Sequence, residues 1–159
     1  MEIRKADEED IEHIKTIIDR NFDEVVIKYH SPTIVSKFKE HNSIVNLKSQ
    51  LNWKKVYVAA ENEKIVGTGA FADFGTEEIP KYSISNLYVL PELHNKKIGT
   101  MLLDILMEDA KKAGAISFHV PSSRNSICFY EKFGFSVDNV QSDKEDEITW
   151  MTRFITEED

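Results

Sequence analysis

Residues 87–100 read Leu87-Tyr88-Val89-Leu90-Pro91-Glu92-Leu93-His94-Asn95-Lys96-Lys97-Ile98-Gly99-Thr100. An apolar strand stops at a proline, a short polar and basic loop follows, and a helix begins near Gly99. Free backbone amides and the positive end of the helix dipole would then face an anion, with two lysines beside them. An ordinary strand-to-helix turn with solvated lysines is the alternative. The stretch lacks the G-K-[ST] signature of a nucleoside-triphosphate loop, which excludes that class of site.

The apolar pattern on both sides of this stretch predicts the other elements. Helices are expected over 7–20, 31–38, 41–52, 98–113 and 125–133. Strands are expected over 3–5, 56–60, 65–71, 82–89, 116–120, 135–140 and 147–154. Asp7 and Ser31 are placed to cap helix starts, and Gly114 and Gly134 to end helices. No linker or repeat interrupts the 159 residues, so we expect one mixed α/β domain with helices packed on a central sheet.

One motif points to a different fold. Residues 67–72, Gly-Thr-Gly-Ala-Phe-Ala, fit the G-x-G-x-x-G/A fingerprint of dinucleotide-binding proteins. That fingerprint functions only where a helix begins, because the helix amides meet the pyrophosphate. Here the chain reaches Pro80 with no room for a helix, so we reject the nucleotide fold. The glycines instead indicate a strand that another element approaches closely, or a bulge.

Composition narrows the function classes. With 28 acidic and 20 basic residues the net charge is −8, which disfavours nucleic-acid binding and favours a cationic substrate. No apolar run approaches the ~20 residues of a membrane span, and no secretory leader is recognised. The single cysteine, Cys128, forms no internal disulfide, so we expect a cytoplasmic protein. The five histidines show no paired metal-ligand spacing, and no metal is predicted. We expect the acidic tail 157–159 to be solvated.

A second stretch is informative together with the first. Residues 125–135 read Asn-Ser-Ile-Cys-Phe-Tyr-Glu-Lys-Phe-Gly-Phe. In order and spacing the two stretches resemble the GCN5-related N-acetyltransferase (GNAT) family. Its motifs read roughly L-x-V-x-P-x-x-[RQ]-x-x-G-x-[GA] and N-x-x-[AS]-x-x-x-Y-x-x-x-G-F. These motifs are degenerate singly and fairly specific as a pair, and the order of elements extends the resemblance over nearly the whole chain.

The resemblance implies a fold and an activity. The fold would be a mixed central sheet of about six to seven strands flanked by about four helices. The activity would be that of an N-acetyltransferase, with acetyl-CoA (coenzyme A) as co-substrate and no metal. The acetyl group would pass to a primary amine by direct attack in a ternary complex. The acceptor could be a polyamine, an amino acid, an aminoglycoside-like compound or a protein N-terminus, and homodimers are common in the family.

The resemblance also implies roles for individual residues. The strand backbone of Leu87 and Val89 would bind the pantetheine arm, and an amide near Tyr88 or Val89 would stabilise the oxyanion. His94 begins the loop whose backbone amides would cradle the pyrophosphate. Those amides belong to Asn95, Lys96, Lys97, Ile98, Gly99 and Thr100. Asn125 would hydrogen-bond the cofactor, and Tyr130 would be the general acid for the departing thiolate.

The sequence departs from the family pattern at three places. His94 stands where the family prefers arginine or glutamine, and Lys97 stands where it usually has glycine, which relaxes the backbone dihedrals. Histone-type members carry a glutamate where Ser83 lies, so the base must be water or another group, such as Glu24, His30 or Asp73. A catalytically silent acyl-CoA-binding module, such as a dimeric regulator, is therefore the alternative function.

Overall fold

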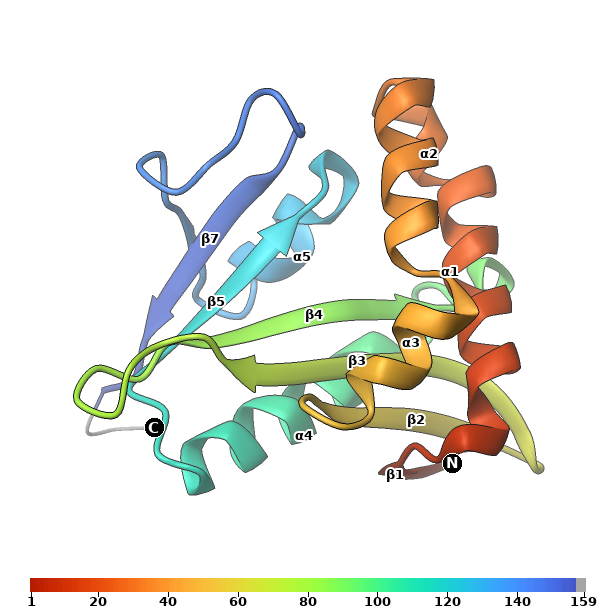
Figure 1. Cartoon of the computed structure of the whole chain (residues 1–159), viewed down its shortest axis with the longest axis horizontal. Helices are drawn as coiled ribbons and strands as arrows, with labels where there is room; N and C mark the ends of the chain where they lie inside the picture. The colour runs from red at the N-terminus through yellow and green to blue at the C-terminus, as the bar shows by residue number, and fades with distance from the viewer. Residues whose placement is uncertain (157–159) are drawn as a thin grey trace.

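Seven strands form one sheet in the order β1-β2-β3-β4-β5-β7-β6 (Figure 1). The structure is a computed structural model, and it describes residues 1–156. The acidic tail 157–159 lies outside the described residues. The strands are β1 (Glu2–Lys5), β2 (Lys55–Glu61), β3 (Lys64–Asp73), β4 (Tyr82–Val89), β5 (Ser117–Ser122), β6 (Ser136–Val137) and β7 (Thr149–Phe154).

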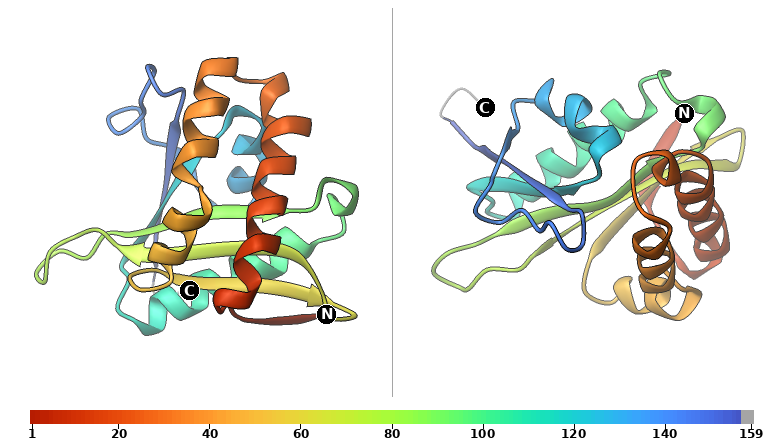
Figure 2. Two further views of the ribbon diagram at one scale, coloured as in Figure 1. Left: turned by 45° about the vertical axis from the view of Figure 1, so that its right-hand side comes forward. Right: turned by 90° about the horizontal axis from the view of Figure 1, so that it is seen from above.

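Helices cover both faces of this sheet (Figure 2). The α-helices are α1 (Ile11–Glu24), α2 (Pro32–His41), α3 (Ile44–Gln50), α4 (Ile98–Lys112) and α5 (Ile127–Glu131). Short 3₁₀ turns are η1 (Glu8–Asp10), η2 (Val26–Lys28), η3 (Pro91–Leu93) and η4 (Arg124–Ser126). The view from above places α1, α2 and α3 on one side of the sheet and α4 and α5 on the other. The described residues thus confirm the predicted mixed α/β fold, with seven strands and five α-helices.

Local sequence accounts for most of the helix boundaries. The side chain of Asp7 caps η1, which leads into α1, and Ser31 caps α2 ahead of Pro32. Gly114 takes a φ of +114° after α4, and Gly134 a φ of +84° after α5, which glycine adopts without steric cost. The core face of α1 is an apolar stripe at helical spacing, formed by Ile11, Ile14, Ile17, Ile18 and Phe22.

Close packing of α4 on β3 explains the two glycines of the rejected nucleotide motif. Both lie inside β3, and no helix begins after them. A Cβ atom at Gly67 would stand 2.9 Å from Leu102 Cδ1, and one at Gly69 would stand 2.7 Å from Leu106 Cδ1. Only glycine lets the α4 side chains come this near to the strand.

The sheet opens between its two central strands. β4 and β5 run parallel but pair only at Tyr82–Phe118 and Ser83–His119, and beyond this point the strands diverge (Figure 1). β4 also carries a bulge, because its register to β3 shifts between Ser85 and Tyr88, with Asn86 at a φ of +53°. The second half of β4 is therefore unpaired on its β5 side, and the gap between the two strands is this unpaired backbone edge.

Two predicted elements differ from the structure. The helix expected over 125–133 is the 3₁₀ turn η4 followed by the short helix α5. The strand expected over 135–140 is the two-residue β6, because Asp138 Oδ1 accepts hydrogen bonds from the Val140 and Gln141 amides at 3.1 and 3.3 Å. An aspartate that binds the backbone just ahead of it turns the chain out of the strand.

Candidate active site

The loop between η3 and α4 has an unusual backbone. Asn95 and Lys97 both take a φ of +66°, while His94 between η3 and this loop has a φ of −61°. Alternation between negative and positive φ turns successive backbone amides toward one concave side, which is a typical anion site. The first intrahelical bond of α4 runs from the Met101 amide to the Lys97 carbonyl, and no side chain caps the helix. The amides of residues 98–100 therefore remain available to an anion.

Side chains around this loop divide into two groups. Lys96 and Lys97 are exposed and supply positive charge, whereas the side chain of Ile98 is buried, so Ile98 can contribute only its amide. Gly99 faces α5, because a Cβ atom there would lie 3.6 Å from the Phe129 ring and 3.9 Å from Val89 Cγ2. The two sequence stretches that suggested the site thus meet at Gly99.

Lys97, the N-cap residue of α4, stands at the position where the family motif has its first glycine. Its φ of +66° and ψ of 13° place it in the left-handed region, which costs an L-residue roughly 1–2 kcal/mol. The lysine is therefore accommodated at an energetic cost.

The end of β4 is held from two sides. The Val89 carbonyl accepts one hydrogen bond from Asn21 Nδ2 at 2.8 Å and another from His94 Nε2 at 2.9 Å. The Leu90 amide bonds to Val66 on β3, so the alternating antiparallel register turns the Leu87 and Val89 backbone groups away from β3 and toward the gap. With its carbonyl satisfied inside the protein, Val89 presents its N–H as the group open to a ligand.

Asn21 is a site residue that the sequence reasoning missed. It is buried on the apolar face of α1, where its amide also donates to the Ile17 carbonyl at 2.9 Å. The sequence signal that could have found it is an asparagine at a position on the same helix face as the core isoleucines. A buried side-chain amide needs hydrogen-bond partners, so such a residue indicates a polar contact inside the core.

Tyr130 lies on α5, with its ring packed edge-on against Phe129 and Phe135. Within residues 1–156 its hydroxyl has no hydrogen-bond partner, and it is not fully enclosed, because no completely buried polar side-chain atom there lacks a partner. Burial, and to a smaller extent the neighbouring Tyr88, raises the pKa of Tyr130 above its ordinary value, and burial raises the pKa of Tyr88 to about 12. Both phenols are therefore protonated at neutral pH, and Tyr130 can act as a proton donor.

Asn125 lies in η4, just ahead of α5. Its Oδ1 atom accepts a hydrogen bond from Ser123 Oγ at 2.8 Å, and its Nδ2 atom makes a longer contact of 3.4 Å to Ser126 Oγ. The side chain is half-buried and oriented by these serines.

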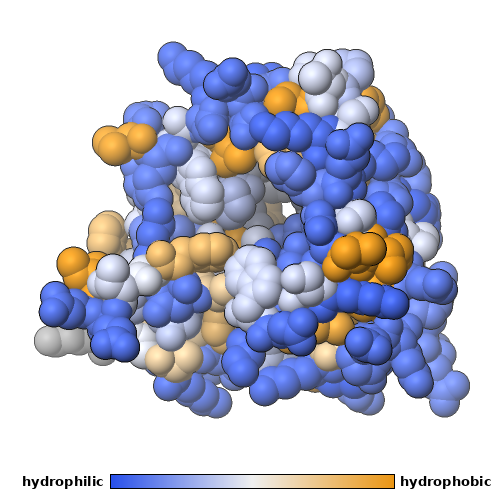
Figure 3. Space-filling model, viewed as in Figure 1, coloured by the Kyte–Doolittle hydropathy of each residue, from blue (hydrophilic) through white to orange (hydrophobic). Residues whose placement is uncertain are grey.

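A pocket of about 130 Å³ opens on the sheet face opposite α4. Its apolar wall comes from α1, η2 and α2, and its polar wall from β4, β5 and the loop before β7. The lining residues are Phe22, Val26, His30, Ile34, Phe38, Asn42, Ser85, Asn86, Tyr88, Pro121, Ser122, Ser123, Asp146, Glu147 and Ile148. In Figure 3 the surface is hollowed between the α2 side and the β5–β7 side, with hydrophilic residues on both rims.

Hydrogen bonds fix the acidic wall of this pocket to α2. Glu147 accepts a hydrogen bond from Ser31 Oγ at 2.7 Å and contacts His30 Nδ1 at 3.2 Å. Both bonds lower the pKa of Glu147, and the bond from Ser31 has the larger effect. Asp146 pairs with Lys37 Nζ at 2.6 Å. The loop before β7 is thereby pinned across the mouth of the pocket.

None of the three side chains considered as a base is free. His30 Nε2 accepts the Arg124 amide at 3.0 Å, so its hydrogen resides on Nδ1 and is donated to Glu147. Glu24 pairs with Arg20 on the surface at 2.7 Å. Asp73 Oδ1 accepts from two amides of the turn that follows β3, at 2.8 Å each.

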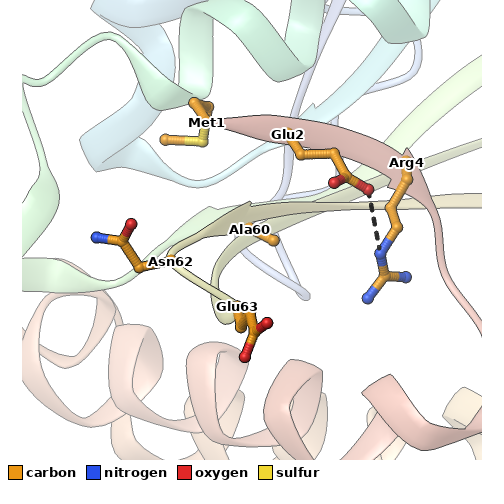
Figure 4. A pocket seen from close by; sticks show the side chains of 6 residues that line it. All are labelled: Met1, Glu2, Arg4, Ala60, Asn62 and Glu63. Atoms are coloured by element: carbon orange, nitrogen blue, oxygen red, sulfur yellow. Dashed lines mark ion pairs between the residues drawn. The ribbon is translucent and has the colours of Figure 1, made fainter.

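Another hollow, of about 380 Å³, lies at the edge strand β1 and is lined by Met1, Glu2, Arg4, Ala60, Asn62 and Glu63 (Figure 4). Its ion pair, Arg4 Nε to Glu2 Oε1 at 3.8 Å, is exposed, and its lining includes none of the candidate site residues.

Within residues 1–156, no cluster of three or more histidine, cysteine, aspartate or glutamate side chains could hold a metal ion. None of the helices within residues 1–156 has the length and apolar character needed to cross a membrane.

Comparison with known proteins adds to this geometry. The family model described as "Acetyltransferase (GNAT) domain" matches residues 52–137. No curated protein sequence matches the chain. The coenzyme A complex of PaiA N-acetyltransferase from Thermoplasma acidophilum is 22% identical, with a TM-score of 0.84 over 97% of this chain and 98% of that chain.

Two structures from Brucella melitensis are also similar. A GNAT family acetyltransferase in complex with acetyl-CoA is 20% identical over 98% of this chain and 88% of that one, with a TM-score of 0.70. A ribosomal-protein-alanine N-acetyltransferase is 17% identical over 98% of this chain and 100% of that one, with a TM-score of 0.69. At these identities, the likeness establishes a common fold.

Proposed function

Because this chain belongs to the GNAT acetyltransferase family, we propose that it transfers an acetyl group from acetyl-CoA to a primary amine of a small molecule or peptide. The similar structures with coenzyme A or acetyl-CoA bound support this choice of donor. The transfer is proposed to occur by direct attack of the amine within a ternary complex, the route that the family resemblance implies, so that no covalent enzyme intermediate forms.

One observation carries the proposal. β4 pairs with β5 only at Tyr82 and Ser83, and the helix α5 that carries Tyr130 packs against the start of α4, where the Phe129 ring faces Gly99. The loop suits a pyrophosphate, and the backbone of Leu87 and Val89 suits an extended amide chain added alongside a strand. A thioester at the inner end of the gap then meets the pocket on the opposite face of the sheet.

Different residues of the site stabilise the oxyanion and protonate the leaving thiolate. A β4 amide at the bulge, near Tyr88 or Val89, stabilises the oxyanion that develops on the attacked carbonyl. Tyr130 donates a proton to the departing thiolate, and its raised pKa keeps that proton in place until the thiolate forms. The amine must also lose a proton before or during its attack.

The acidic wall of the pocket supports a cationic acceptor. Asp146 and Glu147 line it, and the net charge of the chain is −8. The apolar wall of α1 and α2 suits the hydrocarbon body of such an amine. We therefore expect small aliphatic diamines to be better acceptors than acidic peptides, with an advantage that falls as salt is added.

Donor binding is tested by thermal melting with acetyl-CoA. The wild type should melt at a higher temperature when the ligand is present, and Gly99→Glu should remove that shift, because the carboxylate enters the space between Val89 and Phe129. Met101→Glu is the matched control, since it adds the same charge to an exposed position of α4. A wild-type melting curve that saturating acetyl-CoA leaves unmoved would refute donor binding.

Transfer is tested by release of the coenzyme A thiol with a panel of amines and acidic peptides. Amine-dependent release supports an acetyltransferase, whereas acetyl-CoA binding without release for any amine would identify a silent acyl-CoA-binding module. Asp146→Asn should raise the KM for a diamine, with Glu145→Gln, an exposed neighbour that does not line the pocket, as control. Acidic or neutral peptides as the best acceptors, with no salt dependence, would contradict the cationic preference.

A further inference from the structure

Lys54 lies between α3 and β2, and its side chain is turned inward. Its Nζ atom donates a hydrogen bond to Ser85 Oγ at 3.1 Å and lies 5.0 Å from the centre of the Trp53 ring. Over residues 1–156, no carboxylate forms an ion pair with it. Enclosure without an opposite charge disfavours the ammonium form of this amine, although the cation–π contact with the Trp53 ring favours it.

The surroundings of this amine are neutral. Burial alone lowers the pKa of Lys54 to about 8, and no charged group of a neighbouring element contributes. The carboxylate residue of β3 is Asp73, and its Oδ1 atom already accepts hydrogen bonds from two backbone amides of the turn after β3. Lys48 on α3 and Lys55 at the start of β2 are exposed, and β4 carries no charged residue. Lys54 is thus partly unprotonated near neutral pH, unlike an ordinary lysine.

Ser85 connects Lys54 to the acceptor pocket. The Ser85 hydroxyl contacts Lys54 on one side, and Ser85 lines the pocket together with Asn86 and Tyr88. Ser85 is the last residue of β4 in register with β3 before the bulge, so it stands next to the point where the strands diverge. A proton released in the pocket has a short hydrogen-bonded route to Lys54.

The reaction needs such a route. An aliphatic amine is mostly protonated at neutral pH, and its lone pair becomes nucleophilic only when that proton leaves. His30, Glu24 and Asp73 are all engaged in other hydrogen bonds or ion pairs. Of the two pocket carboxylates, Glu147 is bound by Ser31 and His30, and Asp146 is paired with Lys37.

We propose that Ser85 and Lys54 form a proton relay that deprotonates the acceptor amine. The proposal rests on the proposed acetyltransferase function. The substrate ammonium gives a proton to Ser85 Oγ, and the Ser85 hydroxyl proton passes to the neutral Lys54 amine, which becomes an ammonium. The freed amine attacks the thioester carbonyl, and the nitrogen of the tetrahedral intermediate loses its second proton to solvent. The carbon–sulfur bond then breaks, and Tyr130 protonates the thiolate. Solvent then removes the proton from Lys54 and restores that of Tyr130.

Kinetics at varied pH separate this role from a structural one. Lys54→Met should lower kcat/KM for the amine by roughly 10–100-fold at pH 7.5, with an unchanged KM for acetyl-CoA. The deficit should close at high pH, where the acceptor is already neutral. Lys54→Arg keeps the positive charge and the donor but cannot lose a proton, so it should be as defective as Lys54→Met. Lys55→Met, the exposed neighbour, is the control and should match the wild type.

Ser85→Ala tests the other half of the relay and should show the same deficit and the same recovery at high pH. If Lys54→Arg is as active as the wild type, or if the Lys54→Met deficit is equal at every pH, the relay is refuted. A wild type that transfers acetyl to no amine would instead refute the proposed function.

A measurement without turnover tests the relay independently. The titration of the Lys54 amine, followed by NMR of lysine labelled at Cε and assigned with Lys54→Arg, should have a midpoint well below that of the exposed Lys55. A midpoint for Lys54 equal to that of Lys55 would overturn the proposal. Intact-protein mass after incubation with acetyl-CoA provides one more outcome, because stoichiometric acetylation of Lys54 would make it an acceptor and exclude it as a proton acceptor.

Discussion

Replacement of Lys97 by glycine should stabilise the protein, although it removes a side chain and a charge. Lys97 is held at a φ of +66° and a ψ of 13°, and its side chain makes no capping bond. Relief of the left-handed conformation is worth roughly 1–2 kcal/mol, and the greater backbone entropy that glycine loses on folding offsets about 0.5–1 kcal/mol. The net gain is about 0.5–1 kcal/mol, which corresponds to a rise in Tm of about 1–4 °C for a chain of this size.

Lys96→Gly is the matched control for this prediction. Lys96 is exposed, adjacent and equally charged, but its φ is not positive, so glycine there relieves no strain and should lower the Tm slightly. Thermal melting of the two variants without ligand isolates the contribution of the dihedral. If both variants shift the Tm equally, or if Lys97→Gly lowers it, the attribution of strain to position 97 is wrong.

The two remaining predictions concern the proton donor and the acid stability. Tyr130→Phe keeps the ring packing and removes the hydroxyl, so kcat should fall by roughly 10–10⁴-fold with little change in the KM for acetyl-CoA, as measured by thiol release; a folded variant with wild-type turnover would reduce Tyr130 to a packing residue. Asp10 is buried and accepts two bonds from Arg4, at 2.8 and 2.9 Å, which lower the pKa of Asp10 below its ordinary value. Its stabilisation is present above the unfolded pKa of about 3.9 and is lost as the pH falls through the lower folded pKa. Asp10→Asn should therefore cost about 1–3 kcal/mol in urea unfolding at pH 7 and much less near pH 2, and an equal cost at both pH values would contradict this assignment.

The sequence by itself determined the features that depend on neighbours along the chain. Asp7 and Ser31 cap helix starts, and Gly114 ends α4, because capping bonds and left-handed glycines act within a few residues. The alternation of strand and helix periods predicted the sheet and its helices. The motif resemblance predicted the family, because the loop before α4 and the segment from η4 through α5 are each continuous in sequence. The departure at Lys97 from the glycine of the family motif could be recognised from the sequence for the same reason, because that motif is also continuous in sequence.

Only the tertiary structure decided which polar groups are already bound and which remain free. Asn21 reaches the Val89 carbonyl across 68 residues of chain, and His30 meets Glu147 across 117. These contacts occupy a backbone carbonyl and an imidazole that the sequence left open as ligand and base. Lys54 and Ser85 are 31 residues apart, and nothing local marks either of them. Burial and hydrogen-bond partners arise when distant segments pack together, so the ionisation of a lysine or a histidine is a property of the folded chain rather than of the residues beside it.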